Sequence, residues 1–190
     1  MQQVLTASQD EDHTNDVQIK SELSADAIAI YQSVIEKWLS NSHESLNVAA
    51  QTYPLGASPG SMALGDCACS NSFPAENILA AAQSFRTLAP NIIARKGVRL
   101  VSPSAQAAAI RANDPGKRGR RVPVKDAVAN AFANGLFSLS EIAFDSDHKH
   151  ALVSYSFHCG ALCGSGATLL FEKKGNEWKR MDQDCGGWIS

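Results

Sequence analysis

The chain of 190 residues has no apolar run close to the ~20 residues that a membrane-spanning helix needs, so we predict no membrane span. Its first residues, MQQVLTASQDEDHTNDVQ, lack the basic segment followed by an apolar segment that marks a secretion signal. Charged residues are few, at 19 %. Apolar residues reach 44 %, which is enough to build a sizeable core. These numbers predict a soluble globular protein.

Recognisable catalytic motifs are also missing. The chain has no G-x-S-x-G, which excludes the usual serine hydrolase elbow. The glycine-rich segment 160–165 lacks the lysine of a phosphate-binding loop. Residues 145–147, DSD, are too few for a calcium loop and predict a hairpin turn instead. The sequence therefore indicates no catalytic residue and no cofactor.

Charge is segregated along the chain. Residues 1–26 carry six Asp or Glu against one lysine, whereas residues 95–125 carry nine Lys or Arg against one Asp. The first 22 residues also have too little apolar content to fold, so we predict a disordered acidic tail at 1–22 and a single domain at 23–190.

Helical periodicity dominates the first two thirds of the chain. We predict helices over 24–39, 74–88, 103–113 and 123–134, with Ser24 as the N-cap of the first. Residues 46–55 predict an extended segment and residues 98–101 a short strand. Two of the helices have apolar stripes that predict their buried faces: Ile78, Leu79, Ala82 and Phe85 in one, and Val124, Val128, Ala131 and Phe132 in the other.

From Leu136 onward the periodicity changes to two. Strands are predicted over 139–145, 151–159, 167–173 and 178–182, with a turn at 174–176 and a possible last strand at 188–189. Helices first and strands last favour an α+β fold, in which the N-terminal and central helices pack on a C-terminal antiparallel β-meander over residues 137–190.

Five cysteines are the most informative residues: Cys67, Cys69, Cys159, Cys163 and Cys185. Cys159 and Cys163 flank a glycine-rich turn and can reach the ~5.5 Å Cα separation of a disulfide. Cys185 could then pair with Cys67 or Cys69. Because clustered cysteines are unusual in a reducing compartment, they favour export, with the protein secreted or periplasmic.

Zinc binding by the cysteine cluster and His158 is an alternative, although C-x-C is a borderline ligand spacing. His158 and Cys159 are strand neighbours that should point to opposite faces, so they would not bind one metal together. A catalytic cysteine would need a histidine brought close in space, for which His43 and His150 are candidates.

A basic segment offers a second candidate site. Lys117, Arg118, Arg120 and Arg121 could bind a polyanion, supported by Arg95, Lys96, Arg99 and Arg111. No aromatic residue is interleaved with these charges, and no nucleic-acid-binding motif is present, so we do not expect nucleic acid as a partner. A solvated loop, or one that contacts the acidic tail, is the plainer interpretation.

The segment 138–181, closed by CGGWIS, carries C-G-x-L-C-G-x-G at 159–166, followed by Lys173-Lys174-Gly175 and Trp178. In these elements it resembles the C-terminal region of a group of uncharacterised, exported bacterial proteins. The resemblance implies an α+β fold and export, and no activity. A weaker similarity to cone-shaped NTF2-like domains rests on the first helix and the meander.

The sequence therefore predicts a secreted or envelope-associated protein that binds or interacts, without enzymatic machinery, and that disulfides stabilise. Its partner would be a protein or a polyanion. Two alternatives remain: a hydrolase-like enzyme with a pocket between the meander and the helices, and a zinc-binding protein. Convergent His, Asp or Cys side chains in a buried pocket would favour an enzyme, and an apolar pocket would favour binding.

Overall fold

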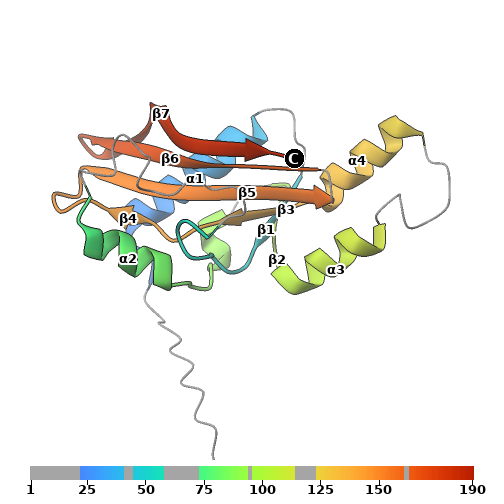
Figure 1. Cartoon of the computed structure of the whole chain (residues 1–190), viewed down its shortest axis with the longest axis horizontal. Coiled ribbons are helices and arrows are strands. Elements are labelled where there is room, and N and C mark those ends of the chain that lie inside the picture. Colours follow the sequence, from blue (N-terminus) through green and yellow to red (C-terminus); the bar gives the residue numbers. More distant parts are fainter. Residues whose placement is uncertain (1–21, 41–44, 58–72, 94–95, 114–122, 161–162) are drawn as a thin grey trace, which may run out of the picture.

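A computed structural model of the chain describes residues 22–40, 45–57, 73–93, 96–113, 123–160 and 163–190. The α+β class is confirmed (Figure 1). The helices are α1 (Ala25–Leu39), α2 (Ala75–Gln83), the 3₁₀ helix η3 (Pro90–Ile93), α3 (Pro103–Asn113) and α4 (Val124–Asn134). The strands are β1 (Leu46–Ala49), β2 (Val98–Val101), β3 (Leu136–Leu139), β4 (Ala143–Phe144), β5 (His150–Gly160), β6 (Cys163–Lys174) and β7 (Glu177–Ile189).

The strands form one sheet in the order β2-β1-β3-β5-β6-β7, and β4 pairs with β5 beside β3. β1 runs parallel to both β2 and β3, whereas every later pair is antiparallel. The C-terminal meander is thus extended by two N-terminal strands. α1 lies along one face of this sheet, as Figure 1 shows.

The first helix forms as its sequence predicts. The Ser24 hydroxyl accepts a hydrogen bond from the Ala27 backbone N–H at 3.2 Å, which satisfies one of the donors left open at a helix start. Its inward face buries Ile30, Tyr31, Val34 and Ile35. These side chains pack against the sheet and provide the hydrophobic free energy that holds α1 in place.

Alternation along β5 divides the core between the two faces of the sheet. Val153 and Phe157 pack under α1 in the larger cluster, while Leu152 packs in a smaller cluster on the opposite face. Ala81 of α2 belongs to that smaller cluster, and Cys185 of β7 does too. α1 and α2 therefore cover opposite faces.

Two predicted buried faces are only partly right: Ile78 and Ala131 pack against the core clusters, but most of the other predicted side chains are exposed. α2 ends at Gln83 rather than at residue 88, because residues 86–88 are extended and pair with residues 50–52. The Thr52 N–H donates to the Arg86 carbonyl oxygen, and Thr87 forms an antiparallel bridge with Gln51. Five of the eight side chains predicted to be buried are 39 to 79 % exposed: Leu79 of α2, Phe85 beyond its end, and Val124, Val128 and Phe132 of α4. α3 and α4 contain no buried residue, because they extend past the end of the sheet (Figure 1).

The meander differs from the prediction in two places. The expected strand at 139–145 is split into β3 and β4 at Ser140–Ile142. There the Ser154 N–H of β5 donates to the Ser140 hydroxyl instead of to a backbone carbonyl, and the Glu141 N–H donates to the Tyr53 carbonyl oxygen. The expected strands at 178–182 and 188–189 are one strand, β7. None of the helices in the described part of the chain is long and apolar enough to cross a membrane. The predicted acidic tail lies outside that part, apart from Glu22.

Candidate functional site

A cavity of about 470 Å³ lies between α1 and the sheet. α1 contributes one wall and the middle of β7 contributes another, while β3, β5 and β6 form the floor. The volume falls within the ~300–1,000 Å³ of small-molecule sites. The lining side chains are Ser33, Val34, Lys37, Trp38, Phe137, Tyr155, Leu169, Phe171, Arg180, Met181 and Asp182.

Aromatic rings form much of this floor. The Trp38 ring lies 5.2 Å from Phe137 and 5.7 Å from Tyr155, measured between centroids, and Phe137 stacks on Tyr155 at 5.5 Å. The Trp38 ring centroid also lies 5.0 Å from that of Phe157, which does not line the cavity. The floor residues Phe137 and Phe171 are fully buried, whereas Trp38 and Tyr155 are partly exposed to the cavity. Such rings offer flat apolar surface with fixed geometry.

The β7 wall is shaped by irregular pairing. Leu169 pairs with Asp184 and Phe171 with Arg180, so two residues of β6 advance against four of β7. Extra residues on one strand bend it and turn its side chains in new directions. Figure 1 shows this bend in the middle of β7. The bend brings Arg180, Met181 and Asp182 to the cavity.

The rim of the cavity is polar. Lys37 from the last turn of α1 and Arg180 from β7 bring two cations, and Asp182 brings one carboxylate. All three side chains are exposed, so they meet solvent as well as the cavity. Among the described residues, the lining includes no histidine and no cysteine.

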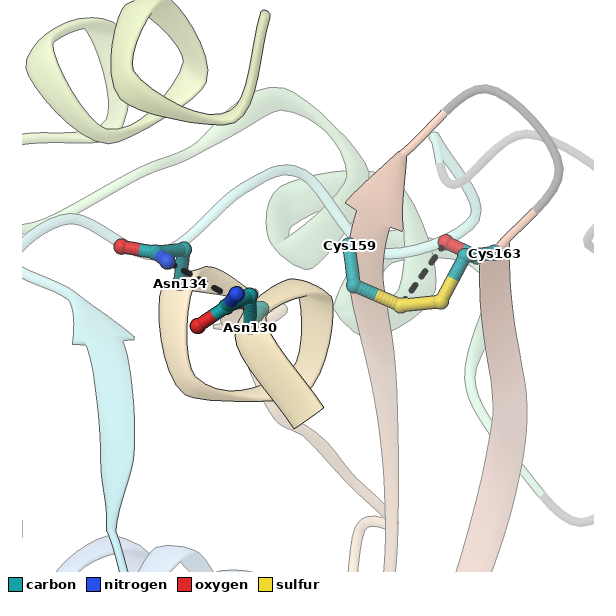
Figure 2. The surroundings of a disulfide bond; sticks show 4 residues. All are labelled: Asn130, Asn134, Cys159 and Cys163. Atoms are coloured by element: carbon teal, nitrogen blue, oxygen red, sulfur yellow. Dashed lines mark hydrogen bonds between the residues drawn. A yellow bond between two sulfur atoms is a disulfide. The ribbon is translucent and has the colours of Figure 1, made fainter. Parts of the chain in front are cut away.

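Cys159 and Cys163 form a disulfide that closes the end of the β5–β6 hairpin, with Cα atoms 5.1 Å apart (Figure 2). At Cys159 the pairing of β5 with β6 shifts its register, between His158 and Gly160. The Cys159 Sγ atom also lies 3.3 Å from the Cys163 carbonyl oxygen, a contact without a proton, because a disulfide sulfur has none to donate.

Cys185 is disulfide-bonded as well and is 7 % exposed in the smaller core cluster. Cys67 and Cys69, the two predicted candidates for its partner, lie outside the described residues. Cysteines that are held in disulfides present no thiolate to a metal or to a substrate. Within the described residues, no group of three or more His, Cys, Asp or Glu side chains could hold a metal ion.

The described histidines that sequence reasoning considered do not line the cavity. The His158 ring lies 5.0 Å from the Trp188 ring, and burial lowers its pKa. His150 Nδ1 lies 2.8 Å from an Asp145 carboxylate oxygen beside the predicted hairpin turn, and His148 stacks on Phe144. His43 lies outside the described residues.

A buried polar cluster lies at another place, and sequence reasoning did not find it. Glu141 is 1 % exposed and accepts hydrogen bonds from the Thr52 hydroxyl and from Arg86 Nε, the latter at 2.7 Å. Tyr31 of α1 donates to the Ser140 carbonyl oxygen at 2.9 Å. Burial and the Glu141 charge raise the pKa of Tyr31. None of these groups lines the cavity, and they tie four chain segments together.

The candidate anion site at Lys117, Arg118, Arg120 and Arg121 lies outside the described residues, as does Arg95. Of its expected supports, Arg99 donates through Nη2 to the Asn47 side-chain oxygen at 2.8 Å. The Asn47 amide in turn donates to the Ala133 and Gly135 carbonyl oxygens. Arg99 thus joins β2 and β1 to the end of α4.

The chain matches no protein-family model, no curated protein and no solved structure. The resemblance to exported bacterial proteins therefore stays a prediction. No motif in the sequence predicted the cavity or its rim. Lys37, Arg180 and Asp182 carried no signal in the sequence, because their places at one cavity depend on how α1 lies on the sheet.

Proposed function

We propose that this protein binds a small molecule with an apolar body in the cavity between α1 and the sheet. The observation that carries the proposal is the aromatic and aliphatic lining of that cavity, including Trp38, Phe137 and Tyr155. Burying apolar ligand surface against such rings supplies binding free energy of about 25 cal/mol per Å² before the costs of association.

The described residues of the lining include no histidine or cysteine, which supports a binding role over the hydrolase-like alternative. A zinc-binding role has less support, because Cys159, Cys163 and Cys185 are held in disulfides. The same disulfides support the second part of our proposal, namely that the protein works in an oxidising compartment such as the periplasm or the extracellular space.

The test uses N-phenyl-1-naphthylamine, an uncharged probe that fluoresces in apolar surroundings. We expect saturable binding of one probe per chain. Ser33→Phe places a ring in the cavity and should weaken probe binding at least about tenfold. Ala29→Phe, one turn earlier on α1 at an exposed position outside the lining, is the matched control and should bind the probe as the natural chain does.

Thermal melts of both variants show whether each chain folds. If no saturable binding occurs, or if Ser33→Phe and Ala29→Phe bind equally, the cavity is not the binding site and the proposal is wrong.

A further inference from the structure

We propose that the ligand of this cavity is an acid, a free small molecule with an apolar body and one anionic group that lies at the rim beside Lys37 and Arg180. This inference rests on the proposed function and extends it to the class of ligand. It commits to a molecule of ordinary ligand size, because a cavity of about 470 Å³ does not hold a two-chain lipid.

The division of the lining fixes where a charge could lie. The floor, formed by Phe137, Leu169 and Phe171, is at most 2 % exposed and entirely apolar. A carboxylate or sulfonate buried there would lose its hydration without gaining a partner. An ionised group must therefore lie at the rim, where it keeps contact with water while the apolar body fills the interior.

Lys37 and Arg180 reach the cavity from different walls, one from α1 and one from β7. An anion at the rim can thus interact with both cations. The guanidinium of Arg180 can donate two parallel hydrogen bonds to one carboxylate or sulfonate, and the ammonium of Lys37 adds a second charge.

Negative charge at the rim is smaller. Asp182 supplies one carboxylate, and the carboxyl end of α1 adds a partial charge of about half a unit. Lys37 lies in that last turn and offsets the partial charge. Among the described residues that line the cavity, the balance of charge stays positive, which favours an anionic ligand over a cationic one.

The experiment compares two probes with the same ring system. 8-Anilino-1-naphthalenesulfonate carries a sulfonate that N-phenyl-1-naphthylamine lacks, so the ratio of their dissociation constants isolates the charge. With the full disulfide-bonded chain at low salt, we expect the sulfonate to bind about tenfold more tightly. Raising the salt concentration should reduce that ratio, because exposed charges are screened.

Lys37→Gln and Arg180→Gln should each weaken binding of the sulfonate about threefold and leave the uncharged probe unchanged, while Asp182→Asn should strengthen it. Lys179→Gln is the matched control, since Lys179 neighbours Arg180 on β7, is exposed and does not line the cavity. Equal effects of Lys179→Gln and Arg180→Gln would indicate non-specific attraction and overturn the inference.

The two proposals fail in different ways. If the uncharged probe binds and depends on Ser33, but the sulfonate binds no more tightly, the cavity is a binding site and the acid inference is wrong. If neither probe binds saturably, the proposed function itself is wrong.

Discussion

Single buried residues hold segments of this fold together that are distant in the chain. Glu141 is the clearest case, because its carboxylate contacts Thr52 beyond β1 and Arg86 beyond α2. The Arg86 Nη2 atom lies 2.5 Å from the same carboxylate. Each of these contacts links residues more than fifty positions apart. The loss of one partner therefore affects three segments at once.

Glu141→Gln should lower the free energy of unfolding by about 3 kcal/mol, because it removes the charge that pairs with Arg86 in a largely buried place. Urea denaturation measures this difference. The control is Glu177→Gln, which removes an exposed pair with Lys179 at 3.5 Å and should change stability by less than about 0.5 kcal/mol. Equal effects of the two substitutions would contradict a stabilising role for Glu141.

Asp26 in the first turn of α1 gives a pH-dependent prediction. Hydrogen bonds from Lys173 Nζ, at 2.9 and 3.0 Å to the two carboxylate oxygens, hold the pKa of Asp26 below its ordinary value of 3.8, and the Trp178 indole adds to the effect. In Lys173→Gln, NMR titration of the Asp26 carboxyl should show this pKa rising toward 3.8.

The sign of the stability effect follows from that direction. The lowered pKa means that the folded chain favours the ionised carboxylate, so the Asp26–Lys173 pair stabilises the fold above pH 3.8. Its contribution should fall as the pH drops through the lowered pKa. The stability difference between the natural chain and Lys173→Gln should therefore shrink in acid, and a difference that grows in acid would count against the pair.

At the scale of elements, the end of β7 is fixed against β6 by close packing. A Cβ atom added at Gly166 would lie 2.5 Å from Trp188 Nε1 and 2.7 Å from the Tyr155 carbonyl oxygen. Real Cβ contacts are never so short, so either the Trp188 ring or the strand must move. Glycine at this position lets the indole lie directly on the strand.

We expect Gly166→Ala to destabilise the fold by about 1–3 kcal/mol, the usual cost of overpacking, and to change the tryptophan fluorescence. Gly160→Ala is the matched control in the same hairpin. A Cβ atom added at Gly160 would lie 3.8 Å from the Cys163 Cβ atom, which is an ordinary van der Waals contact. Thermal melts that show no difference between these variants would exclude close packing of Trp188 as a constraint.

The Cys159–Cys163 disulfide closes a short loop between β5 and β6, with a sequence separation of four. Loop-closure entropy for so short a loop corresponds to about 2 kcal/mol. The double substitution Cys159→Ala/Cys163→Ala should lower stability by up to that amount, as read from thermal melts without reductant. Melts of both chains in reductant supply the control, since the difference should then nearly vanish.

For the whole molecule, the cysteines predict a definite thiol count. The chain has five cysteines, of which Cys159, Cys163 and Cys185 are disulfide-bonded. If Cys185 pairs with Cys67 or Cys69, two bonds leave one thiol. Denatured protein without reductant should therefore react with one equivalent of a thiol reagent, and reduced protein with five. Three free thiols would show that Cys185 is unpaired.

The cavity is also a property of the whole molecule. It exists because α1 crosses the aromatic rings of the sheet at Trp38 and because β7 bends away from β6 opposite Leu169. A bound ligand would stabilise the folded chain by about 2.7 kcal/mol at a concentration of 100 times its dissociation constant. Ligand binding should therefore raise the melting temperature of the whole chain.

The sequence by itself determined the elements whose signals are local. Ser24 and the apolar stripe behind it predicted α1, because capping and helical periodicity act within a few residues. Alternation predicted β5 and most of the meander, and the spacing of Cys159 and Cys163 allowed their bond. The same local signals predicted too large a buried face on α2 and α4, because a stripe on a helix does not show how much of it a partner covers.

Only the tertiary structure decided the cavity, its charged rim and the cluster around Glu141. Lys37 and Arg180 line one cavity because α1 lies across the sheet, and Thr52 contacts Glu141 because separate segments converge beside β3. Those arrangements depend on packing between elements far apart in the chain, which neither periodicity nor composition specifies.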